Sequence, residues 1–261
     1  MVMLQRLSAC TFEPVCTSHT SATSTQALQS HERFTERICV SQAQTLVGKT
    51  YMVKTFGCQM NLHDSERVRG LLDDCGCVQV ATYREADIVV FMTCSVREKA
   101  DTHLYGQVAN LVVLPDPPSG KRVVAIGGCI AQRDGAKLKK RIPNIDVVFG
   151  TSALACVPEL LCEAFESKSD EVFVDTIEKN RGFSTDLPTH REQSFHAWVP
   201  IMTGCNNFCT FCIVPYVRGR EKSRVLERVV LEAQKLVDEG CLLYTSPSPR
   251  DRTRSRMPSS A

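Results

Sequence analysis

The sequence lacks a long apolar run, since no stretch approaches the ~18 residues that a membrane-spanning helix needs. It also shows no secretory signal. We therefore expect a cytoplasmic protein that does not enter a membrane, with its 14 cysteines present as thiols rather than disulfides. Hydrophobic residues make up 43% of the chain, which is enough for a globular core and argues against wholesale disorder.

The chain has little net charge of either sign. Its formal charge at pH 7 is +2, and residues 250–256, with four arginines against one aspartate, account for more than that total. The part before them is therefore nearly neutral and has no strong excess of basic residues of the kind that binds nucleic acid. If the protein handles RNA, the basic surface must be local or must lie outside this chain.

Three cysteines stand close together as C-x3-C-x2-C, at Cys205, Cys209 and Cys212 (the loop cysteines), and no fourth cysteine or histidine follows at ligand distance. Structural zinc sites and ferredoxin-type clusters usually take four protein ligands. Three thiolates instead suit a [4Fe-4S] cluster whose fourth iron stays open to a small molecule. A zinc site or a chance grouping of thiols is the alternative. Gly204 would let the backbone turn tightly beside the first ligand.

Apolar segments alternate with segments of helical periodicity through the middle of the chain. This alternation predicts an α/β fold with a doubly wound parallel sheet. The expected strands are residues 51–56, 87–92, 122–126 and 146–149.

Three further cysteines, Cys58, Cys94 and Cys129 (the edge cysteines), each lie just beyond the carboxyl end of an expected strand. Loops at that end of parallel strands share one edge of the sheet, where ligands bind, and a nearby helix N-terminus favours a thiolate. The alternative is that they are ordinary buried cysteines. His63 and His103 occur near these loops and are expected to be surface or capping residues rather than ligands.

The segment 204–224 resembles the cluster loop of the radical S-adenosylmethionine (SAM) methylthiotransferases, and most of all their branch that acts on dimethylallyladenosine in tRNA. Segments 54–61, 92–100 and 127–132, which contain the edge cysteines, look like the three blocks of that family's N-terminal domain. The resemblance covers roughly residues 48–240 and implies a first domain followed by the start of a radical SAM (βα) partial barrel.

The resemblance also implies roles for these residues. The loop cysteines would bind a [4Fe-4S] cluster whose open iron is chelated by SAM, with Phe211 contacting SAM. The edge cysteines would bind an auxiliary [4Fe-4S] cluster that carries the sulfur. A 5′-deoxyadenosyl radical made from SAM would activate C2 of N(6)-dimethylallyladenosine beside the anticodon, where the methylthio group is added. The implied partners are tRNA and an electron donor such as flavodoxin or ferredoxin, and we expect a monomer.

Arg218 and Arg220 belong to a basic run that follows the loop cysteines. They would approach substrate phosphates or stabilise the neighbouring helix and linker. The alternative is a solvated face without a specific role.

The expected organisation is a disordered extension at 1–48, the N-terminal domain at 49–165, a linker at 166–195 and the start of the radical SAM domain at 196–240. The last of these contains an amphipathic helix, capped by Ser223 or a neighbour and stopped by Gly240. Residues 241–261, rich in Pro, Ser and Arg, are expected to be a non-native or disordered tail, with an RNA-binding basic tail as the competing interpretation. A barrel needs about 30 residues per βα unit, so we expect a truncated barrel and an inactive chain.

Two other functional classes remain open at this point. Within the same enzyme family, the substrate could be threonylcarbamoyl-adenosine in tRNA or an aspartate of a ribosomal protein. Outside it, the chain could be a non-catalytic iron–sulfur or zinc protein.

Overall fold

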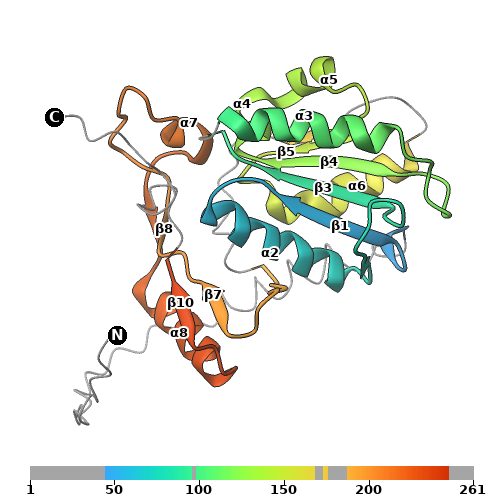
Figure 1. Cartoon of the computed structure of the whole chain (residues 1–261). Coiled ribbons are helices and arrows are strands. Elements are labelled where there is room, and N and C mark those ends of the chain that lie inside the picture. The colour runs from blue at the N-terminus through green and yellow to red at the C-terminus, as the bar shows by residue number, and fades with distance from the viewer. Residues whose placement is uncertain (1–44, 96–97, 168–172, 176–186, 247–261) are drawn as a thin grey trace, which may run out of the picture. The chain divides into compact units, whose positions relative to one another are not determined.

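A computed structural model of the chain describes residues 45–95, 98–167, 173–175 and 187–246 (Figure 1). The expected extension at 1–48 therefore lies outside the described residues except for its last four, and so does the tail from residue 247. In the part that is described, no helix is long and apolar enough to cross a membrane.

The first part of the chain forms a six-stranded parallel sheet of strand order β2-β1-β3-β4-β5-β6. This confirms the predicted α/β fold with a parallel sheet. The strands are β1 (Thr50–Thr55), β2 (Val78–Gln79), β3 (Ile88–Thr93), β4 (Val123–Gly128), β5 (Val147–Phe149) and β6 (Phe173–Asp175).

Two of these strands, β2 and β6, were not predicted. They are two and three residues long, which is too short to show an alternating pattern. β6 pairs with β5 although it lies in the segment 166–195 that the sequence assigns to a linker, so the sheet extends past the expected boundary at 165.

Helices cover both faces of the sheet (Figure 1). One core layer contains buried side chains of α2 and α6, and the other contains those of α3, α4 and α5. Consecutive residues of β3 alternate between the layers, with Val90 and Met92 in the first and Val89 and Phe91 in the second. The helices are α2 (Gln59–Asp74), α3 (Glu98–Val112), α4 (Cys129–Asp134), α5 (Leu138–Arg141) and α6 (Val157–Glu166), with 3-10 turns η1 (Gly135–Lys137) and η2 (Leu154–Cys156).

The later part of the chain contains a second, smaller βαβ unit. β7 (His196–Trp198) pairs in parallel with β10 (Leu243–Thr245), and α8 (Leu226–Asp238) connects them along the chain. Between β7 and α8 lie α7 (Val214–Arg218) and an antiparallel pair of β8 (Met202–Thr203) with β9 (Lys222–Ser223).

Regular structure in this unit continues beyond residue 240, where the sequence places the end of the domain. Cys241 is buried against Leu236 and Ala197, and β10 follows it. The unit therefore includes the first residues of the expected tail.

The ends of α8 match the prediction at one terminus only. Gly240 has φ +80°, and the N–H groups of Gly240 and Cys241 donate to the carbonyls of Val237 and Leu236 at 2.9 Å each. This is a Schellman motif, so the predicted stop at Gly240 is confirmed. The predicted cap by Ser223 or a neighbour is wrong, because Ser223 lies in β9 and the N-cap residue of α8 is Val225, which makes no side-chain cap hydrogen bond.

Candidate functional site

The three edge cysteines lie at the carboxyl ends of three neighbouring strands. Cys58 is the N-cap of α2 after β1, Cys94 directly follows β3, and Cys129 is the first residue of α4 after β4. Because β1, β3 and β4 are adjacent and parallel, these ends meet at the same edge of the sheet. All three side chains are buried.

Two of the edge cysteines contact each other, and the third lies within electrostatic reach. Cys58 and Cys94 are joined by a hydrogen bond and pack in one cluster with Met60. The Cys58 thiol also acts electrostatically on Cys129. The structure thus brings together three thiols that are separated by up to 71 residues in the sequence.

Among the described residues, no three Cys, His, Asp or Glu side chains are gathered as a site for a single metal ion. A single ion requires its ligands to converge on one point. A cluster asks for a different arrangement, because each thiolate binds a separate iron atom.

Two glycines let the backbone come unusually close at this edge. Gly57 has φ +132°, and a Cβ at this position would lie 2.3 Å from the Cβ of Cys94. Gly128 has φ +90°, and its Cβ would lie 2.6 Å from the carbonyl oxygen of Thr93. Any larger residue at either position would push apart the strand ends that carry the thiols.

Asn61 ties the same strand ends together. Its Nδ2 donates to the carbonyl oxygens of Phe56, 3.1 Å away, and Thr93, 2.7 Å away. One buried amide therefore holds the loop after β1 against the end of β3. Sequence analysis assigned Asn61 no role, although it lies in one of the segments that carry the family resemblance.

The thiols of Cys58 and Cys129 differ in acidity. The hydrogen bond with Cys94 is the main cause that lowers the pKa of Cys58 to about 6, and it outweighs burial. The Arg218 charge and the backbone N–H groups of Asn61 and Met60 lower this pKa further. Burial raises the pKa of Cys129, and the Arg218 charge opposes that rise.

Arg218, the last residue of α7, reaches this edge from the later part of the chain. Its Nη2 donates to Asp64 Oδ2 at 2.8 Å and to Asn61 Oδ1 at 3.1 Å, and it is hydrogen-bonded to Cys129. The Arg218 and Asp64 side chains are only 6% and 3% exposed. Burial acts to raise the pKa of Asp64, but the Arg218 charge helps to hold it below its ordinary value.

Of the two roles expected for Arg218, this placement disagrees with contact to substrate phosphates, because the guanidinium is buried, and it agrees with a stabilising role between neighbouring segments. Arg220 is exposed, with its guanidinium 5.3 Å from the centre of the Phe208 ring. His63, expected to be a surface or capping residue, is 1% exposed, and its Nδ1 lies 3.3 Å from Asp64 Oδ1. His103 is exposed, as expected, and stacks on Phe56.

The loop cysteines lie in a short turn that is held by the segment after it. The Cys205 N–H donates to the carbonyl of Gly219 at 3.2 Å, and the Cys212 N–H donates to that of Cys209 at 2.9 Å. Gly204 has φ +76°, and a Cβ there would lie 2.1 Å from the Arg220 carbonyl oxygen, which confirms the predicted tight turn.

The exposure of this loop differs from that of the sheet edge. Cys205, Cys209 and Cys212 are partly exposed, whereas the edge cysteines are buried. Phe211, which the resemblance assigns to SAM contact, is 71% exposed. A small molecule therefore has access to this loop.

Comparison with known proteins gives matches to one family and to curated relatives. Residues 50–150 match the family described as Uncharacterized protein family UPF0004. The chain is 46% identical over 197 residues to the tRNA-2-methylthio-N(6)-dimethylallyladenosine synthase of Saccharopolyspora erythraea, covering 76% of this chain and 40% of the relative. The synthases of the same name from Nocardioides sp. and Streptomyces avermitilis are 46% and 45% identical, over 77% of this chain and 40% and 39% of theirs.

The chain thus spans about 40% of the length of the curated relatives it matches. The alignment with the first of these relatives covers 76% of the chain, so it extends beyond residues 50–150, the part that matches the UPF0004 family. By these matches the chain is similar to the tRNA-2-methylthio-N(6)-dimethylallyladenosine synthases over 76% of its length, and residues 50–150 are similar to the UPF0004 family.

Proposed function

We propose that this chain belongs to a radical SAM methylthiotransferase that adds a methylthio group to C2 of N(6)-dimethylallyladenosine in tRNA. The observation that carries the proposal is the meeting of three buried thiols at one sheet edge, ahead of a separate three-cysteine loop. The relatives of the same name support the choice of substrate. Residues 49–175 would form the auxiliary-cluster domain, and residues 196–245 the start of the radical SAM domain.

The edge cysteines suit an auxiliary [4Fe-4S] cluster, because their donor set consists of soft thiolates from a buried, glycine-lined edge. When bound, this cluster supplies the sulfur that the product needs. The hydrogen bond with Cys94, then the charge of Arg218 and the backbone N–H groups, lower the pKa of Cys58 and favour its thiolate form. Burial of all three thiols keeps water away from them.

The loop cysteines suit a second [4Fe-4S] cluster that leaves one iron for SAM, because the loop supplies three thiolates and is open to solvent on one side. When bound, this cluster supplies the electron that cleaves SAM. Phe211 would cover the bound SAM, since its ring is exposed beside Cys212. Partial exposure of the loop also allows a small reduced carrier, such as flavodoxin or ferredoxin, to approach.

The tRNA would be recognised locally, because the body of the chain carries little net charge. Arg220 stays a candidate for phosphate contact, since it is exposed near the loop cysteines. We propose a cytoplasmic monomer, in keeping with a reducing compartment and a tRNA substrate.

Metal analysis after anaerobic reconstitution tests the two sites. The native chain should bind about eight iron atoms, as expected for two four-iron clusters. A variant with Cys205, Cys209 and Cys212 replaced by Ala should bind about four, as should one with Cys58, Cys94 and Cys129 replaced. Zinc in place of iron, or no loss in either variant, would refute the assignment.

Nucleoside analysis of tRNA tests the reaction. A strain that lacks the gene for this chain should lose the methylthio group from dimethylallyladenosine and keep the unmodified base at that position. Unchanged methylthio content would refute the proposed substrate. Loss from threonylcarbamoyl-adenosine instead would assign the protein to the other tRNA branch.

A further inference from the structure

Arg218 is the residue through which the segment after the loop cysteines contacts the edge cysteines. Its guanidinium donates to Asp64 and Asn61 and is hydrogen-bonded to Cys129. The charge also acts on Cys58, which lies on the neighbouring loop. The Arg218 side chain is therefore hydrogen-bonded to one edge cysteine, Cys129, and acts through its charge on a second, Cys58.

The residue after it contacts the other cysteine group. The Gly219 carbonyl accepts the N–H of Cys205 at 3.2 Å. Gly219 has φ +76°, a conformation that favours glycine and turns the chain back toward the loop. Two consecutive residues thus bond to the two groups of cysteines, one through its side chain and the other through its backbone.

The helix that carries Arg218 is short and anchored on both sides. α7 begins after Ile213, which directly follows the last loop cysteine, so Cys212 and Arg218 are joined by little more than one helical turn. The Val217 carbonyl accepts a hydrogen bond from Thr151 Oγ1 at 2.6 Å, and α7 packs against α4, whose first residue is Cys129. This segment therefore sets where the loop lies relative to the sheet edge.

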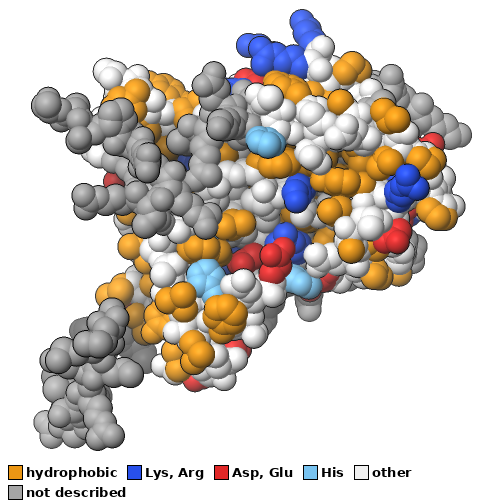
Figure 2. Space-filling view, viewed as in Figure 1, with side chains coloured by type: hydrophobic (Ala, Val, Ile, Leu, Met, Phe, Trp, Pro, Cys, Tyr) orange, Lys and Arg blue, Asp and Glu red, His pale blue; other side chains and the backbone are white. Residues whose placement is uncertain are grey.

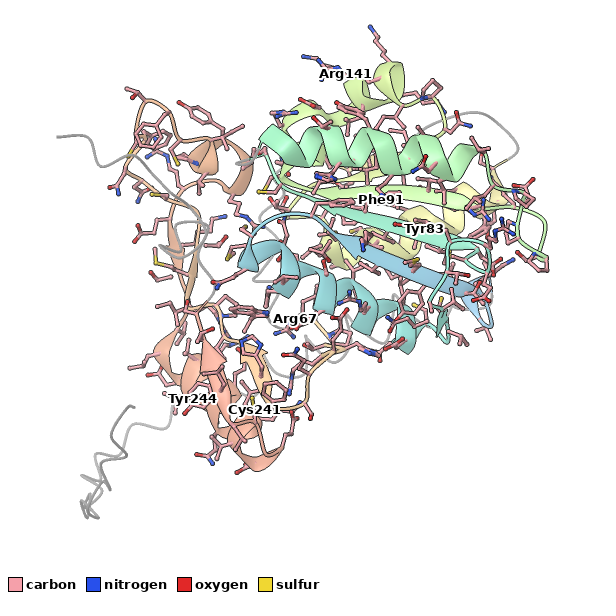
Figure 3. All side chains as sticks on the ribbon, viewed as in Figure 1. Arg67, Tyr83, Phe91, Arg141, Cys241 and Tyr244 are labelled. Atoms are coloured by element: carbon pink, nitrogen blue, oxygen red, sulfur yellow. The ribbon has the colours of Figure 1, made fainter. Side chains whose placement is uncertain are left out.

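Other ion pairs join the same parts of the chain without reaching a thiol. Arg67 of α2 (Figure 3) donates to Glu232 of α8 at 3.1 Å, and Arg191, in the segment before β7, pairs with Glu239 at 2.7 Å. These contacts serve to hold the parts of the chain together. A buried pair such as Arg218–Asp64 is weak support for stability as such, since removing both charges from water is costly. Its contact with Cys129 indicates a different use.

We infer that Arg218 is a positioning residue that links the two cysteine groups, giving the edge cysteines a fixed positive charge and a hydrogen bond while its backbone neighbour holds the loop cysteines. The inference rests on the proposed function, because it assumes that the edge cysteines bind a cluster. Asp64 orients the guanidinium and offsets part of its charge. The positive charge of Arg218 therefore favours the thiolate form of the edge cysteines, and the negative charge of Asp64 disfavours it.

The test removes the charge of Arg218 in one variant and that of Asp64 in another, and compares how each change affects the iron bound at the edge cysteines. The full chain, with the loop cysteines replaced by Ala so that only the edge cysteines remain, is reconstituted anaerobically with iron and sulfide. Arg218→Gln and Asp64→Asn are introduced separately into this background. The measurements are bound iron, the rate of iron loss to a chelator, and the reduction potential of the cluster by electron paramagnetic resonance.

The two variants should behave oppositely. Arg218→Gln should bind its iron about 10- to 100-fold more weakly, the usual effect of removing a group that supports a metal ligand, and should therefore lose it faster to the chelator. Its potential should shift lower, because a lost positive charge and a lost hydrogen bond to sulfur both disfavour adding an electron. Asp64→Asn should keep its iron and shift to a higher potential, because Arg218 remains beside the thiols.

A merely structural ion pair would give a different pattern. It predicts that both variants are destabilised and lose iron to the same extent, because each removes the same contact, and this result would overturn the inference. Unchanged iron retention and potential in Arg218→Gln would also overturn it. If Arg218→Gln does not fold, loss of iron from Asp64→Asn still refutes the inference.

A matched control separates general weakening from the specific effect. Arg191→Gln removes an ion pair of similar length that lies away from the thiols. It should leave iron retention and potential unchanged, and a change as large as that of Arg218→Gln would overturn the inference. If the background itself binds no iron, the auxiliary site of the proposed function fails, and the inference fails with it.

Discussion

Replacing Gly128 with Ala should destabilise the chain through its backbone, next to Cys129. Gly128 has φ +90° and ψ −153°, a region that essentially only glycine occupies, and placing another residue there costs about 1–3 kcal/mol. The new Cβ would also lie 2.6 Å from the oxygen and 3.0 Å from the nitrogen of Thr93. Thr93 cannot withdraw freely, because it is paired with Gly128 in the β3–β4 ladder.

We therefore place the cost near the upper end, at about 3 kcal/mol. For a chain of this size that corresponds to a melting temperature lower by about 6 to 12 °C. The assay is thermal unfolding of the metal-free chain, followed by circular dichroism under a thiol reductant. No metal is needed, so the result does not depend on cluster loading.

Two other glycines provide matched controls. Gly120→Ala keeps the unfavourable φ of +104° but meets nothing within 4 Å, so it should cost about 1 kcal/mol. Gly106→Ala lies within α3 in open space and should raise stability by up to about 1 kcal/mol. If Gly128→Ala melts no lower than Gly120→Ala, the close approach at the sheet edge is not as tight as described and the reasoning fails.

Three further predictions concern α2 and the smaller unit. Burial raises the pKa of Glu66 to about 7 against its ordinary 4.5, so between these pH values the folded chain binds a proton that the unfolded chain has lost, and the stability of the fold should fall as pH rises from 4.5 to 7. Glu66→Gln should remove this pH dependence, measured as the difference between melting temperatures at pH 5 and pH 8. The same difference in the variant and the native chain would contradict the assignment. Gly240→Ala should cost about 1 kcal/mol in urea unfolding, because the Schellman motif needs a positive φ, and an unchanged midpoint would argue against the motif. Leu236→Ala should cost about 2–3 kcal/mol through a cavity, whereas Leu231→Ala, which is 70% exposed, should cost under about 0.5 kcal/mol; equal effects would show that α8 does not pack through Leu236.

The exposed apolar side chains of the smaller unit give it a surface unlike that of the larger one. Within α8 only Leu236 is buried, and hydrophobic side chains gather over the part of the molecule that holds α8 and β10 (Figure 2). The strands of the larger sheet are instead covered by helices on both faces. The smaller unit is therefore the part whose stability depends most on a few contacts, and the Leu236→Ala prediction tests it directly.

The sequence by itself determined the features that depend on neighbours along the chain. Alternating apolar and helical segments predicted the parallel sheet and placed Cys58, Cys94 and Cys129 after the strands. Parallel strands bring such positions to one edge of the sheet, so the sequence indicated that the thiols could converge there, with ordinary buried cysteines as the alternative. The tight turn at Gly204 and the stop at Gly240 were also predicted, because each rests on the conformational freedom of a single residue.

Tertiary structure alone decided the features that depend on residues far apart in the chain. β6 exists because β5 offers it a partner, and no periodicity of its own marks it. In the sequence, Arg218 belongs to a run of basic residues, a pattern typical of a solvated surface. In the folded chain it is buried, because it pairs with Asp64, which lies 154 residues earlier. A charge becomes stable in the interior only when an opposite charge and hydrogen bonds meet it there, and that meeting is a property of the folded chain.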